Sequence, residues 1–162
     1  MSDFKNLSSD LGKLIIRDHS FKKFNKINRT SFAAFEDISI WRRRTINTNR
    51  AIVLIKLSNH IVNNINNIGE YAQEIKIKLG KEIGYIFFIY SLGLQIIFYG
   101  DDIIGLADNL EDYVDKYDNQ RVVLQSIHIL DRQNKKNKSV RTWGQWFTGK
   151  YQNLIEEVIE QN

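Results

Sequence analysis

The sequence predicts an α+β or mixed α/β fold, with a sheet of about five strands and helices packed on it. Segments with apolar residues at helical spacing alternate with compact β-branched runs, in the order α-β-β-α-β-β-α-β-α. Hydrophobic residues make up 43% of the 162 residues, which is enough for one core. Because no repeat or linker interrupts the pattern, we expect a single globular domain over residues 1–162.

The first part of the chain predicts a helix followed by a hairpin. Leucines spaced four and three residues apart place a helix at about residues 3–17. The basic segment at about residues 19–31 is expected to be a loop or an arm. Residues 35–41 and 51–57 form strand-like runs on either side of a turn-prone stretch at residues 45–49, so they predict a hairpin.

A longer apolar stripe follows the hairpin and predicts a second helix. Its apolar residues step by four and three alternately from Ile61 to Leu79, which places them on one face. The side chain of Ser58 or Asn59 can accept hydrogen bonds from the unpaired backbone amides at the start of this helix. Gly80 can adopt the left-handed conformation past its end.

The second half of the chain predicts two central strands, a helix, a strand and a final helix. Residues 85–90 and 94–99 are apolar on both faces, as in strands that are covered on two sides. Residues 101–117 begin with two aspartates and carry an apolar stripe, which favours a helix. Residues 121–130 predict an inner strand, and the polar, basic residues 132–140 predict a loop. The apolar spacing in residues 151–158 predicts the last helix.

The composition excludes several classes of protein. The chain has no cysteine, so disulfides, thiolate metal sites and a cysteine nucleophile are excluded. The N-terminus lacks the basic start and apolar run of a signal peptide, and we expect the cytoplasm or another reducing intracellular compartment. The apolar segment at residues 84–100 is shorter than the roughly 20 residues of a membrane helix, so membrane insertion is not expected.

No metal and no cofactor are expected. The three histidines, His19, His60 and His128, have no ligand spacing, and no glycine-rich phosphate loop is present. Asp131 ends a predicted strand, where ligand sites form in open sheets, but a turn start or a salt bridge to Arg132 is the simpler explanation. The sequence leaves open whether His128 and Asp131 are functional.

Two basic segments that contain tryptophan carry the main functional hypothesis. Trp41 precedes three consecutive arginines, and residues 132–150 hold the second segment, with an acidic stretch at residues 101–131 between the two. Charge sorted in this way indicates a charged partner. Because side chains alternate along a strand, Arg42 and Arg44 follow the core side and would need carboxylate partners there. The alternative is that the strand extends past the core as a basic β-ribbon with Trp41 at its base.

We therefore expect a binding domain without enzymatic activity, whose partner is nucleic acid held by a basic hairpin and a basic loop. The candidate phosphate contacts are Arg42, Arg43, Arg44, Arg50, Lys135, Lys136, Lys138 and Arg141. Trp41 and Trp146 are the candidate stacking residues for bases.

Two alternatives remain open. The acidic and basic faces could instead meet a protein partner or a second copy of the chain in an assembly. The third hypothesis is a diverged Mg²⁺-dependent nuclease of the restriction-endonuclease type, with Glu36 or Asp37 on one strand and Lys56 on the next. Such enzymes carry an acidic residue two positions before the lysine, and Leu54 stands there instead.

Overall fold

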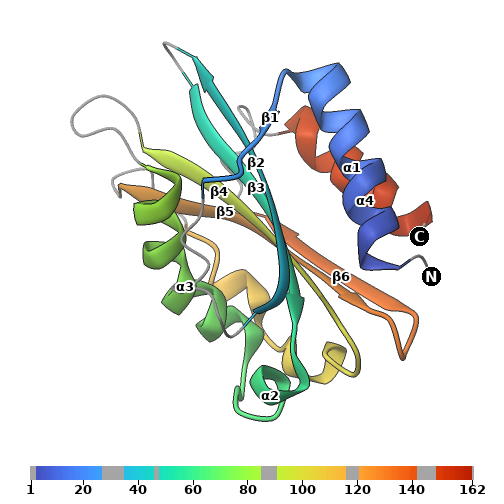
Figure 1. The fold of residues 1–162 in the computed structure, drawn as a ribbon. Helices are drawn as coiled ribbons and strands as arrows, with labels where there is room; N and C mark the ends of the chain where they lie inside the picture. The colour runs from blue at the N-terminus through green and yellow to red at the C-terminus, as the bar shows by residue number, and fades with distance from the viewer. Residues whose placement is uncertain are drawn as a thin grey trace.

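A computed structural model describes residues 3–26, 35–45, 48–84, 91–115, 121–141 and 149–161, in which one mixed sheet carries helices on both faces (Figure 1). The strands are β1 (Lys22–Lys23), β2 (Phe35–Thr45), β3 (Thr48–Leu57), β4 (Leu92–Gly100), β5 (Val122–Asp131) and β6 (Lys136–Arg141). The helices are α1 (Phe4–His19), α2 (Asn59–Val62), α3 (Ile68–Ile83) and α4 (Gly149–Gln161), with short 3-10 helices η2 (Ile104–Leu106) and η3 (Leu110–Asp112). The predicted combination of helices and a sheet is confirmed, with six strands in the sheet where about five were predicted.

The strands follow one another across the sheet in chain order. β1, β2 and β3 are antiparallel neighbours, β3, β4 and β5 are parallel, and β6 runs antiparallel to β5. Because the three parallel strands point the same way, their carboxyl ends lie together at one end of the sheet. The β2–β3 hairpin lies at the other end, so it is far from the turn between β5 and β6 (Figure 1).

Each face of the sheet carries its own hydrophobic core, because side chains alternate along the strands. In β3, Ala51, Val53 and Ile55 belong to the core under α3, whereas Ile52 and Leu54 belong to the core under α1 and α4. Figure 1 shows α1 and α4 together on one face and α3 on the other. Below, these are called the α1 face and the α3 face.

The single helix predicted after the hairpin is divided into α2 and α3. The asparagine-rich segment at residues 63–67 separates them, because asparagine side chains compete with the helical backbone for hydrogen bonds. Asn67 then caps α3, since its side-chain oxygen accepts from the amides of Gly69 and Glu70. The apolar stripe did not reveal this break, because Ile61 and Ile68 still pack on the same core.

Gly80 lies inside α3, not past its end as predicted. A Cβ at this position would lie 2.3 Å from Cγ2 of Val122, so glycine lets the helix approach β5 closely. The helix ends instead at Gly84, which has the positive φ of 81° that favours glycine.

The predicted helix over residues 101–117 is wrong for the part that the structure describes. Only η2 and η3 form there, each three residues long. Asp102 and Asn109 have φ values of 54° and 49°, which an α-helix cannot accommodate. The carboxylate of Asp131 accepts hydrogen bonds from the amides of Asp102 (3.2 Å) and Ile104 (2.8 Å), and so fixes this non-helical path.

The loop predicted over residues 132–140 is largely an edge strand, because β6 pairs with β5 from Lys136 to Arg141. Part of the segment predicted as a loop over residues 19–31 forms β1, which pairs with β2. The strand predicted over residues 85–90 lies outside the described residues.

Candidate functional site

Trp41, predicted to stack on bases, is a core residue. It is 1% exposed and packs on the α1 face. A Cβ at Gly12 would lie 3.0 Å from its indole Nε1, so α1 covers the ring directly. Trp41 is not available to a base, and its assignment as a stacking residue is wrong.

Arg42 holds the end of α3 in place. Its guanidinium donates to the carbonyl oxygens of Ile83 (2.6 Å) and Gly84 (2.7 Å), and to Oδ1 of Asn49 at 3.1 Å. Partial burial lowers the pKa of Arg42, and the nearby charge of Arg44 lowers it further. Helix-end carbonyls, and not a carboxylate, are therefore the partners of Arg42 on the core side, and its assignment as a phosphate contact stays a prediction.

The remaining arginines of the hairpin divide between the faces. Arg43 and Arg50 are half-buried and lie directly opposite one another on β2 and β3. Arg44 is exposed near the hairpin end. The exposed Lys22 and Lys23 of β1 lie alongside, since Lys22 pairs with Arg42 in register.

The second predicted basic segment lies elsewhere. Lys135 and Lys136 are exposed at the turn between β5 and β6, at the other end of the sheet from the hairpin. Lys138 donates to the carbonyl of Ala107 at 2.6 Å, and Arg141 pairs with Glu156 at 3.5 Å. The hairpin and the loop therefore lie at opposite ends of the sheet and do not form one surface. Trp146 lies outside the described residues.

His128 and Asp131, which the sequence left open, are buried on β5. Asp131 accepts hydrogen bonds from Asp102, Ile104 and Asn134. Burial opposes ionisation of Asp131, but these hydrogen bonds outweigh it and hold its pKa below the usual value. Asp131 organises the loops at the carboxyl end of the sheet.

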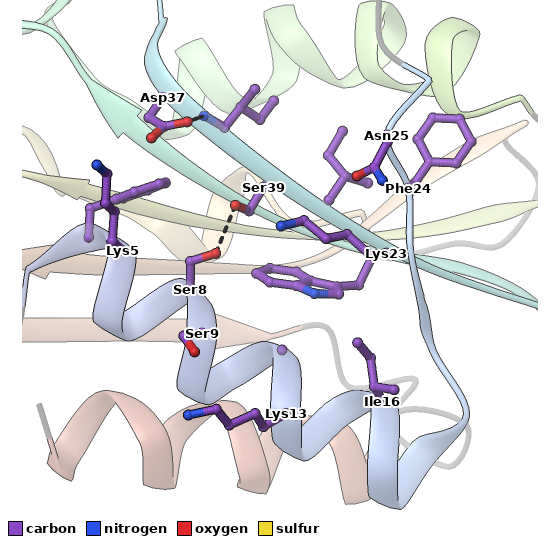
Figure 2. Close-up of a pocket in the computed structure, with 15 residues that line it drawn as sticks. Lys5, Ser8, Ser9, Lys13, Ile16, Lys23, Phe24, Asn25, Asp37 and Ser39 are labelled. Atoms are coloured by element: carbon purple, nitrogen blue, oxygen red, sulfur yellow. Dashed lines mark hydrogen bonds between the residues drawn. The ribbon is translucent and has the colours of Figure 1, made fainter.

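A groove of about 760 Å³ lies between α1 and the β1–β2 edge of the sheet. Figure 2 shows Lys5, Lys13 and Lys23 around it, and Ser8 hydrogen-bonded to Ser39 across it at 2.8 Å. Its lining residues are Phe4, Lys5, Ser8, Ser9, Gly12, Lys13, Ile16, Lys23, Phe24, Asn25, Asp37, Ile38, Ser39, Ile40 and Trp41. Three lysines and one carboxylate line the groove, and although Lys13 pairs with Asp10 at 3.3 Å, the groove is basic.

The outer edge of β2 beside this groove is partly closed to hydrogen bonding. Phe24 donates its amide to the carbonyl of Ile40, so the backbone groups of Ile40 point outward from the sheet. Ile38, two residues earlier in the strand, points its backbone groups the same way. Its amide already donates to Oδ1 of Asp37 at 2.8 Å, which leaves no donor there for an added strand.

A smaller pocket of about 280 Å³, called the charged pocket below, lies at the carboxyl end of the parallel strands. Its lining residues are Glu36, Lys56, Leu57, Asn59, Tyr99, Gly100, Asp101 and Arg132. Lys56 pairs with Glu36 at 2.6 Å, and the Nε of Arg132 donates to Asp101 at 2.6 Å. The hydrogen bond to Glu36 raises the pKa of Lys56 despite partial burial, and Asp101 raises the pKa of Arg132.

The groove and the charged pocket adjoin one another on the α1 face. Phe4 lines the groove and Tyr99 lines the pocket, and their rings pack edge to face with centroids 5.7 Å apart. Glu36 lines the pocket and the next residue, Asp37, lines the groove. The nuclease hypothesis named these two carboxylates with Lys56, and only Glu36 forms an ion pair with that lysine.

Within the described ranges, no group of three or more histidine or acidic side chains is arranged to hold a metal ion. No helix among the described residues is long and apolar enough to cross a membrane.

No protein-family model matches this chain, and no curated protein or solved structure is significantly similar to it.

The walls of the groove are the part of the site that sequence reasoning missed. Lys5, Ser9 and Lys13 are spaced four residues apart, and this spacing places them along one side of α1. This polar line along α1 indicates one wall of the groove, whereas the apolar stripe of the helix indicates only its buried side. Lys23 was missed because its segment was predicted as a loop, so its pairing with β2 was not foreseen.

Proposed function

We propose that this protein binds the phosphate backbone of nucleic acid in the basic groove between α1 and the β1–β2 edge. The observation that carries the proposal is the wall chemistry: lysine and serine side chains face one another along the groove. Ammonium and hydroxyl groups are common partners of phosphate oxygens. Among the described residues, no ion pair engages Lys5 or Lys23, so both can neutralise phosphates.

The surrounding charges support the same partner. The exposed Lys22 and Arg44 add basic charge near the hairpin, although strand alternation places them on the α3 face and not in the groove. Beyond Asp101, which lines the charged pocket, the acidic segment that follows β4 packs on the opposite face, because Ile103 and Leu110 belong to the core under α3. Phosphates in the groove are therefore separated from that segment by the sheet.

A peptide is a weaker candidate for the groove. An extended peptide would bind by adding a strand to the open edge of β2, through main-chain hydrogen bonds. The outward amide of Ile38 is already bonded to Asp37, which removes a donor that such a strand needs. A nucleic-acid backbone requires no strand register and uses the side chains instead.

The test is the salt dependence of binding, measured by fluorescence anisotropy with labelled single-stranded DNA, single-stranded RNA and duplex. Lys5→Ala/Lys23→Ala removes two groove charges, and Lys78→Ala/Lys81→Ala removes two exposed charges from α3 as a matched control. We expect only the groove variant to lose affinity and to reduce the slope of log K against log salt by about 1.5, at ~0.7–0.9 per phosphate. Absence of binding at low salt, or equal losses in both variants, contradicts the proposal.

A second candidate function, hydrolysis of the bound strand, has one observation in its favour. Glu36 and Lys56 meet at 2.6 Å in the charged pocket, and Asp101 lines the same pocket as a second carboxylate. Its test is cleavage of labelled nucleic acid with and without Mg²⁺. Activity that depends on Mg²⁺ and is lost in Glu36→Ala and Lys56→Ala supports it, and no cleavage by the wild type removes it.

A further inference from the structure

The charged pocket holds two cations that share one small space. Lys56 and Arg132 both line it, and the charge of Arg132 lowers the pKa of Lys56 against the larger effect of Glu36. Tyr99 and Asn59 add neutral polar groups to the same lining. The lining balances these two cations with two carboxylates, Glu36 and Asp101, so the pocket can take an anion only where the carboxylates give up the cations.

The pocket continues the line of the groove. Phe4 and Tyr99 join the two by a direct ring contact, and Glu36 and Asp37 are consecutive residues on β2. Lys56 lies two residues after Leu54, which packs on the core of the α1 face, so its side chain lies on that face as well. A chain of phosphates held by Lys5 can therefore extend to the pocket without leaving the α1 face.

We propose that the charged pocket is a second phosphate subsite for the same strand, in which Lys56 and Arg132 exchange their carboxylate partners for a backbone phosphate. This proposal rests on the proposed function of the groove. In this proposal Glu36 and Asp101 are internal counterions. They pair with Lys56 and Arg132 until a phosphodiester displaces them.

The exchange is feasible because both ion pairs are partly exposed. The side chains of Glu36 and Arg132 are 53% and 50% exposed, and those of Asp101 and Lys56 are 34% and 27% exposed. Ion pairs in contact with solvent contribute little to stability, so the single hydrogen bond between Lys56 and Glu36 opens most readily. The bidentate pair of Arg132 with Asp101 opens at a greater cost. The two carboxylates can turn toward water, and a phosphate can then accept the same two hydrogen bonds that the Arg132 guanidinium now donates to Asp101.

The proposal predicts opposite effects from the cations and from their partners. Removal of the cations in Lys56→Gln/Arg132→Gln should weaken binding. Neutralisation of the counterions in Glu36→Gln/Asp101→Asn should strengthen binding, because the phosphate then meets neither competition nor repulsion. A purely structural role of the ion pairs predicts no gain from the second change.

The experiment measures anisotropy in EDTA, so that hydrolysis does not interfere. We expect Lys56→Gln/Arg132→Gln to bind about tenfold more weakly, as for the loss of a charge-assisted hydrogen bond. Glu36→Gln/Asp101→Asn should bind several-fold more tightly. Glu74→Gln/Glu111→Gln, which removes two exposed carboxylates on the other face, is the matched control and should change little. Thermal melting of each variant confirms folding.

The outcomes separate this subsite from the groove. If Lys5→Ala/Lys23→Ala weakens binding while both pocket variants match the wild type, the second subsite is refuted and the proposed function stands. If the counterion variant gains no more than the Glu74/Glu111 control, the exchange is refuted, because the gain reflects net charge alone. If the wild type binds no nucleic acid, the proposed function fails and the subsite fails with it.

Discussion

Burial determines the charge of His128. The ring is fully buried, and its two nitrogens lie 2.9 Å from the hydroxyl of Ser139 and 3.0 Å from that of Ser126. Burial, together with the smaller effect of the charge of Arg141, lowers its pKa from 6.5 to about 3. The imidazole is therefore neutral in the folded protein, which accounts for this residue as a packed, hydrogen-bonded histidine of the strand.

The depressed pKa makes stability depend on pH in a defined window. Below pH 6.5 the unfolded chain binds a proton at His128 that the folded chain does not bind until about pH 3, so acid favours unfolding. We expect His128 to lower the free energy of unfolding by roughly 1.5 kcal/mol as the pH falls from about 6.5 to about 5. Urea denaturation at several pH values measures it. His128→Gln should flatten this slope, and an unchanged slope contradicts the assignment.

Gln95 shows the opposite situation, a buried amide that is not satisfied. It is 1% exposed, and within the described part of the chain neither polar atom of its side chain has a hydrogen-bond partner. Such a group costs about 1–3 kcal/mol relative to a satisfied one. Gln95→Met keeps the size of the side chain, so we expect it to raise the free energy of unfolding by about 1 kcal/mol.

The control for that prediction is Gln73→Met. The Gln73 amide donates to the carbonyl of Tyr113 and to Asp115, so the same change removes real hydrogen bonds. It should therefore lower stability in denaturation experiments where Gln95→Met raises it. If both variants lose stability, Gln95 has a role that its contacts do not show.

At the level of elements, the approach of α3 to the sheet depends on the absence of a side chain at Gly80. Gly80→Ala brings a Cβ against Val122, and we expect a loss of about 1–3 kcal/mol, as for other overpacked sites. A Cβ at Gly105 would meet nothing within 4 Å, so Gly105→Ala should have little effect. Thermal melting compares the two, and equal effects would show that α3 can shift to make room.

The elements that the sequence predicted well are those whose pattern is local. α1 and β3 follow from leucine spacing and from a β-branched run, and both are confirmed. The helix predicted from Asp101 failed because its path depends on Asp131, which lies 29 residues away from Asp102. β6 was not foreseen because its polar residues form a strand only by pairing with β5.

At the level of the whole molecule, strand direction determines which charged segments can act together. The parallel order of β3, β4 and β5 sends the basic hairpin and the basic β5–β6 turn to opposite ends of the sheet. Basic side chains from α1 and β1 gather beside β2 instead. The sequence alone identified the basic hairpin, but only the folded chain shows that the groove lies between α1 and the β1–β2 edge.

This arrangement predicts unequal roles for the two basic segments. Lys135→Ala/Lys136→Ala removes two exposed charges at the far end of the sheet, and we expect a smaller loss of nucleic-acid affinity than in Lys5→Ala/Lys23→Ala. Anisotropy titrations at matched salt compare them. An equal or larger loss at the turn would place the binding surface there and not in the groove.

The hydrogen bond from Ile38 to Asp37 also bears on how the protein behaves at high concentration. An unpaired strand edge can form main-chain hydrogen bonds with the same edge of a second molecule, and repeated pairing of this kind leads to aggregates. The Asp37 carboxylate occupies an amide on that edge and adds a charge beside it. Within the described residues, Asp37 therefore limits pairing of this part of the β2 edge with a second molecule.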